Sequence, residues 1–270
     1  MGATIAHRPS AAQDGIQCRL MPNVGTIDEV IDALNGIIDA AKTEGSRLGY
    51  FAALYRRVTR EVKRGIAAGR FEDGPRMEHL DVVFANRYLT AYEDWRAGRP
   101  ASRCWALAFG AAARTDRAIT QHLLLGVNAH INFDLAIAAV EIAPGAAIHG
   151  LQRDFQQINK ILSEQISDVQ DAIASVAPLM FLLDFVGRNT DERLVEFSLQ
   201  KARDAAWMQA LVLAEMDGAE RPAAMDVGDH VVSLIGAGVL DPPGLLVRTA
   251  LRLIVWREEP DVRRIVAALE

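Results

Sequence analysis

The strongest constraint on the fold is a helical repeat of apolar residues that starts near Thr26 and continues with few breaks. Between residues 27 and 38, apolar side chains recur every three or four positions, as on one face of an α-helix. Similar patterns predict helices over residues 47–67, 76–95, 102–114, 116–142, 146–176, 190–216, 226–239 and 243–268. No segment shows the alternation and turn residues of a β-strand. We therefore predict an all-α fold of eight to ten helices.

The domain organisation follows from where this repeat begins. Residues 1–25 lack periodicity and are rich in turn-forming residues, so they predict a flexible arm. Residues 26–270 predict a single globular domain built around a buried central helix at about 116–142. Thr26 is the expected N-cap of the first helix, because Glu29 three positions later completes a capping-box pattern.

Charge and composition exclude several classes of protein. The 270 residues are 50% apolar with a net charge of −6, which argues against disorder and against a nucleic-acid-binding protein. Two cysteines cannot form a disulfide framework, so we expect a reduced, cytoplasmic environment. The apolar stretch at 123–148 contains several polar side chains and predicts a buried helix rather than a membrane span.

Polar side chains interrupt the predicted central helix at regular intervals. His122, Gly126, His130 and Asp134 are each four residues apart and form one stripe, while Asn128 and Asn132 form a second. The remaining surface is apolar, so the helix is expected to be buried. An unpaired buried polar group costs about 1–3 kcal/mol. The segment therefore predicts an internal polar network, a bound small molecule or a metal ion.

Two chemistries suit this segment. His130 and Asp134 lie one helical turn apart and can ligate a divalent metal, with His122 or Asp154 completing the set. Without a metal, His130 can act as a general base that Asp134 orients. A third interpretation is structural, with Asp134 orienting His130 only to hold helices together.

Other segments supply candidate substrate-binding residues. We expect these to be Asn128, Asn132, Arg87, Tyr88, Asn159 and Arg203. Arg87 and Arg203 can pair with a substrate carboxylate, or with Asp134 and Asp154. Familiar nucleotide-binding, nucleophile-elbow and zinc-protease motifs do not occur.

Four blocks of the sequence resemble a known family. These are HLDVVFANRY (79–88), LLGVNAHINFDL (124–135), DFQQIN (154–159) and ARDAAW (202–207). Together they resemble an uncharacterised all-helical family of bacteria and fungi, a domain of unknown function. The resemblance implies a helical fold and no established activity. The central segment is also similar to the metal-binding helix of the zinc-dependent phospholipase C and single-strand nuclease group, which implies that His130 and Asp134 are metal ligands.

The sequence thus favours an enzyme that acts on a small organic molecule at a buried His/Asp/Asn cluster. The reaction is expected to be either a metal-assisted hydrolysis or a metal-free cyclisation or elimination of secondary metabolism. A non-catalytic ligand-binding or interaction module is the alternative. We expect neither a nucleic-acid partner nor a membrane span.

Overall fold

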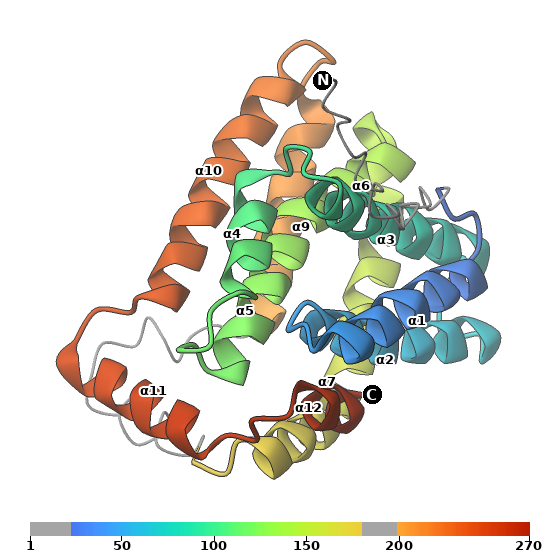
Figure 1. Ribbon diagram of the computed structural model, residues 1–270. Helices are drawn as coiled ribbons and strands as arrows, with labels where there is room; N and C mark the ends of the chain where they lie inside the picture. Colours follow the sequence, from blue (N-terminus) through green and yellow to red (C-terminus); the bar gives the residue numbers. More distant parts are fainter. Residues whose placement is uncertain (1–22, 180–198) are drawn as a thin grey trace, which may run out of the picture.

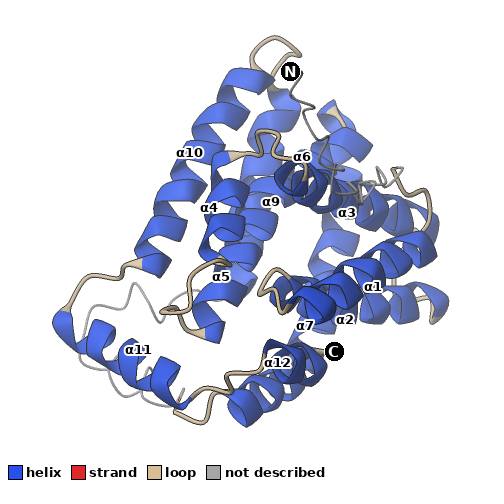
Figure 2. Ribbon diagram, in the orientation of Figure 1, coloured by secondary structure: helices blue, strands red, loops and turns tan. Residues whose placement is uncertain are grey.

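All regular structure in the described part of the chain is helical. The computed structural model describes residues 23–179 and 199–270 (Figure 1). Figure 2 shows helices joined by loops throughout these ranges. The all-α prediction is confirmed. The helices of the first half are α1 (Ile27–Glu44), α2 (Gly49–Ala67), α3 (Gly74–Arg96), α4 (Arg103–Ala111), α5 (Ile119–Ala129) and α6 (Leu135–Ile142). Those that follow are α7 (Gln152–Val176), α9 (Leu199–Glu215), α10 (Arg221–Leu240), α11 (Leu245–Arg257) and α12 (Val262–Leu269).

Local signals set several helix ends. Thr26 caps α1 by accepting a hydrogen bond from the backbone N–H of Glu29 at 3.2 Å, as predicted. Gly45 ends α1 with φ at +65°, a left-handed conformation that favours glycine. Asp73 caps α3 in the same way as Thr26 caps α1, at 2.9 Å from the N–H of Arg76.

Some predicted boundaries differ from the structure. The helix expected over 146–176 begins as a 3₁₀ turn, Gly145–Leu151, and becomes α-helical only at Gln152. The segment 243–268 is divided into two helices, α11 and α12, and here the structure confirms the break that Pro260 predicts through its missing backbone N–H. The start of the helix predicted at 190, and most of the arm predicted over 1–25, lie outside the described residues.

The central helix is buried as predicted, and it carries the candidate site. α5 packs against α2, α4 and α10, and α6 packs against α3 and α9. In Figure 1, α10 lies on one side of α5, and α1 and α2 lie on the other. One large apolar core contains buried side chains from helices between α1 and α12. Polar residues on the central helix therefore have little access to bulk water.

Two helices are long and apolar enough to cross a membrane by length and composition alone. One is the continuous helix over Ile119–Ile142, of which 83% is buried inside the protein, so its apolar character is explained by the core. The other is α10, of which 22% is buried. Its exposed apolar side chains are Val227, Val231, Leu234 and Ile235.

Candidate active site

The central helix changes its winding at the centre of the polar segment. Residues His130–Asp134 form a π-helical turn between α5 and α6, and the N–H of Leu135 donates to the carbonyl of His130 five residues earlier. A π turn is rare, and such turns occur frequently at functional sites. The sequence pattern predicted an uninterrupted α-helix here. The wider turn shifts the angular positions of His130 and Asp134 away from those on a regular helix.

Asp134 is the centre of a buried polar network. Its side chain is 2% exposed and accepts hydrogen bonds from Arg87 Nε at 3.0 Å and from Trp105 Nε1 at 2.8 Å. His130 Nδ1 lies 3.4 Å from Asp134 Oδ2. Arg87 belongs to α3 and Trp105 to α4, so the network ties three helices together. The carboxylate charge is balanced by a guanidinium, which makes its burial tolerable.

His130 is enclosed by aromatic rings. Its imidazole stacks on Phe84 with ring centroids 3.5 Å apart and meets Tyr55 edge-on at 4.4 Å. Burial lowers the pKa of His130 below its usual value, while the neighbouring Asp134 opposes that shift. His130 Nε2 is buried and has no hydrogen-bond partner. A neutral imidazole whose Nδ1–H is directed to Asp134 leaves Nε2 as a free proton acceptor.

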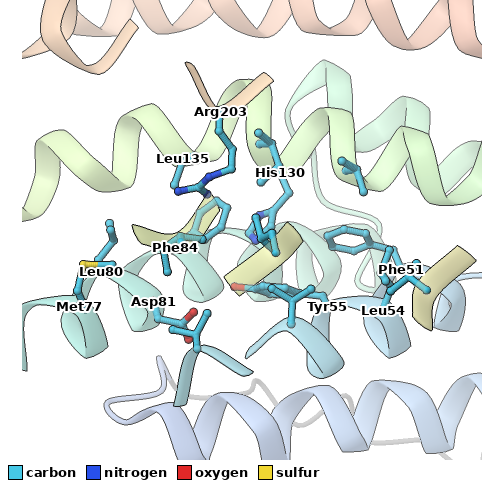
Figure 3. Close-up of a pocket in the computed structure, with 17 residues that line it drawn as sticks. Phe51, Leu54, Tyr55, Met77, Leu80, Asp81, Phe84, His130, Leu135 and Arg203 are labelled. Carbon is cyan, nitrogen blue, oxygen red and sulfur yellow. The ribbon is translucent and has the colours of Figure 1, made fainter. Parts of the chain in front are cut away.

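Beside His130 lies an apolar cavity of about 230 Å³ (Figure 3). Its walls are side chains of α2, α3, α7, α9 and the central helix, among them Leu54, Leu80, Ile158 and Leu162. Among the described residues, the polar or ionisable ones that line it are Tyr55, Asp81, His130 and Arg203. A mainly apolar pocket with a few convergent polar groups is the usual form of a small-molecule site.

Asp81 contributes an unusual carboxyl group to this cavity. Asp81 is 8% exposed, and among the described residues its Oδ2 atom has no hydrogen-bond partner. Burial raises the pKa of Asp81 to about 7, with a further contribution from the charge of Glu78. The Tyr55 hydroxyl points toward Asp81 and is also buried without a partner (Figure 3). Burial holds the pKa of Tyr55 well above its usual value, so this hydroxyl stays protonated.

Arg203 reaches the same cavity from α9. It is 3% exposed, and it donates from Nε to Asn159 Oδ1 at 2.6 Å and from Nη2 to the carbonyl of Phe155 at 2.8 Å. Its guanidinium lies over the Phe155 ring, 4.6 Å from the centroid. Burial lowers the pKa of Arg203 to about 9. The hydrogen bond from Arg203 Nε to Asn159 Oδ1 holds the guanidinium in position.

A second, more open cavity of about 560 Å³ involves the other side of the Asp134 network. Arg87, Trp105 and Asp134 line this second cavity. Of the two cavities, His130 lines the apolar one and not the second. The structure thus brings Arg87 and Asp134 together, as one sequence interpretation expected. It places Arg87 at a different cavity from Arg203.

The remaining candidates on the central helix have other neighbours. Asn128 donates to the carbonyl of Val232 at 2.9 Å and accepts from Asn132 at 2.9 Å, so this pair joins the central helix to α10. His122 and Tyr88 line a small cavity of about 20 Å³. Burial lowers the pKa of His122 to about 4, and it raises the pKa of Tyr88 well above its usual value.

Asp154 lies apart from the His130 cluster. Its carboxylate accepts hydrogen bonds from the backbone N–H groups of Glu72 and Asp73 and pairs with Arg76 Nη2 at 2.8 Å. These contacts hold the connection between α2 and α3 against α7. The structure does not bring Asp154 together with His130 or Arg203.

Two cavity residues were not among the candidates chosen from the sequence. Asp81 stands in the buried stripe of α3 that also contains Met77, Phe84 and Tyr88. Tyr55 occupies the equivalent stripe of α2. The sequence did contain a signal for Asp81. It lies four residues after Met77 and three before Phe84, so the helical repeat places this carboxylate on the core face of its helix.

Close packing between two helices requires a glycine at position 126. A Cβ atom built at Gly126 would lie 2.5 Å from the Phe51 ring. Phe51 in turn meets His130 edge-on and lines the apolar cavity. The glycine thus lets α2 approach the central helix.

We expect Gly126→Ala to lower the free energy of unfolding by about 1–3 kcal/mol, because overpacking outweighs the gain in helix propensity. Chemical denaturation measures this change. Gly36→Ala on α1 is the matched control, since a Cβ there meets nothing within 4 Å. Equal stabilisation in both variants would contradict the close-packing interpretation.

The described part of the chain is all-α and carries a His–Asp pair on a π turn of its buried central helix. Residues 27–242 match the model of the "Family of unknown function (DUF5995)", and the chain belongs to this family. The resemblance to an uncharacterised helical family is thereby confirmed. No curated protein and no solved structure matches the chain.

Proposed function

We propose that this protein is a metal-free acid–base enzyme acting on a small, largely apolar molecule in the 230 Å³ cavity. One observation supports the proposal: among the described residues, neither His130 Nε2 nor Asp81 Oδ2 has a hydrogen-bond partner, and both residues line that cavity. Buried titratable groups with shifted pKa values in a pocket are typical of catalytic acids and bases.

In the proposed chemistry, His130 removes a proton from the substrate through Nε2. The imidazolium that forms is stabilised by Asp134 at Nδ1, and hydrogen bonds from Arg87 and Trp105 hold the Asp134 side chain in place. Asp81 supplies the complementary acid, because its pKa of about 7 leaves a substantial protonated fraction near neutral pH. Such a pair suits eliminations, isomerisations and cyclisations.

The geometry favours this chemistry over a metal-assisted one. Both oxygens of Asp134 already accept hydrogen bonds, one of them from a guanidinium whose positive charge opposes a cation. Within residues 23–179 and 199–270, no group of three or more His, Cys, Asp or Glu side chains gathers to hold a metal ion. Metal ligation by His130 and Asp134 stays a prediction that element analysis of the purified protein tests.

A probe that needs only a base in an apolar pocket tests the proposal. 1,2-Benzisoxazole opens to 2-cyanophenol when a base removes its C3 proton and its N–O bond breaks, and the product absorbs in the near ultraviolet. We expect the wild-type protein to catalyse this opening and His130→Gln to lower the rate by about 100-fold or more. The matched control is His79→Gln, an exposed histidine on α3, which should keep the full rate.

Two results would overturn the proposal. One is a folded His130→Gln protein, judged by circular dichroism, that is as fast as wild type. The other is a wild-type protein that does not accelerate the reaction, which would favour a non-catalytic ligand-binding module.

A further inference from the structure

The cavity contains a buried cation that has no acidic partner among the described residues. Arg203 is 3% exposed, and none of its nitrogen atoms lies within salt-bridge distance of a described carboxylate. Its Nε and Nη2 donate to neutral acceptors, and its Nη1 donates to no described residue. The neighbouring Asp204 is exposed and forms no ion pair with it. Buried charges in proteins are normally paired, so this arginine indicates an anionic ligand.

We infer that the substrate of the proposed enzyme is a small apolar monocarboxylic acid whose carboxylate pairs with Arg203. The inference rests on the proposed function and specifies its substrate class. A planar guanidinium matches the two oxygens of a carboxylate. In Figure 3 the Arg203 guanidinium lies above and the Asp81 carboxyl below, with the Phe84 ring between them and His130 beside that ring. A bound acid would place its anionic end at Arg203 and its apolar body near His130 and Asp81.

The size of the cavity limits the acid. A dry cavity of about 150 Å³ holds benzene. By proportion, the 230 Å³ cavity accepts on the order of ten non-hydrogen atoms. Its walls consist mainly of aliphatic and aromatic side chains, so the body of the acid carries few polar groups. Octanoate has the required size and charge and serves as the probe.

Isothermal titration calorimetry with the full chain tests this inference. We expect wild type to bind octanoate about 10-fold or more tightly than 1-octanol, because only the acid pairs with Arg203. In Arg203→Gln, octanoate affinity should fall by about the same factor while octanol affinity stays unchanged. Arg221→Gln is the matched control: Arg221 also donates to backbone carbonyls, those of Leu213 and Ala214, and does not line the cavity.

The comparison of octanoate with octanol on wild type needs no variant, so it remains decisive even if Arg203→Gln does not fold. Equal or tighter binding of octanol, or no binding of octanoate, would overturn the inference. Tighter binding of octyl phosphate than of octanoate would also overturn it by indicating a phosphate ester. Arg203-dependent octanoate binding by a protein that does not open benzisoxazole would support the anion site while contradicting the proposed catalysis.

Discussion

Asp134→Ala is expected to lower the free energy of unfolding by about 3–5 kcal/mol. The change removes the acceptor of the buried Trp105 N–H and the counter-ion of Arg87 at once. It also frees His130 from its orienting group. Guanidinium chloride denaturation followed by circular dichroism measures the shift.

A surface ion pair provides the control for this substitution. Glu72 pairs with Arg153 at 2.8 Å, and both side chains are largely exposed. Glu72→Ala should therefore change the free energy of unfolding by less than about 1 kcal/mol. Similar losses in the two variants would show that the Asp134 network does not hold the three helices together.

Asp81→Asn is expected to become progressively more stable than wild type as the pH rises from about 4 to about 7. Below about pH 4, Asp81 is protonated in both the folded and the unfolded protein, so its ionisation does not affect stability. Between about pH 4 and pH 7 the Asp81 carboxyl is ionised in the unfolded chain but still protonated in the folded protein, where its pKa is about 7. Wild type therefore loses stability as the pH rises through this range. Above pH 7 the difference is constant. The total change is on the order of 4 kcal/mol.

Urea denaturation of both proteins across this pH range measures the effect. His122 and Glu258, whose pKa values burial shifts to about 4 and about 7, titrate in the same range but occur in both proteins and cancel in the difference. Asp39→Asn, at an exposed position of α1, is the control and should show no such trend. A constant difference between Asp81→Asn and wild type would show that the carboxyl is not buried as a neutral acid.

The fold was largely predictable because its signals are local. Apolar periodicity, the Thr26 cap and the break at Pro260 act within a few residues, and the structure confirms each of them. The 3₁₀ turn before α7 was missed, since the same residues are compatible with an α-helical pattern.

The site was only partly predictable, because it depends on contacts between distant segments. The sequence identified His130, Asp134, Arg87 and Arg203 as polar residues in apolar surroundings. It could not show which of its two possible partners Arg87 has, or that Arg203 has no carboxylate partner in the part of the chain that the structure describes. Asp81 was interpreted as part of a salt bridge or a helix cap and was not chosen as a site residue, because a carboxylate on a helix is usually solvated. Only the packing of α2, α3 and α9 around the central helix shows which polar groups share one cavity.

The π turn at His130–Asp134 has a consequence for comparing members of this family. A hydrogen bond spanning five residues accommodates one residue more than an α-helical turn. A homologue with a single-residue deletion here would therefore form a regular α-helical turn and keep the downstream part of the helix in the same orientation. Only the residues inside the turn would change their relative directions, so the i, i+4 placement of imidazole and carboxylate that the π turn provides would be lost.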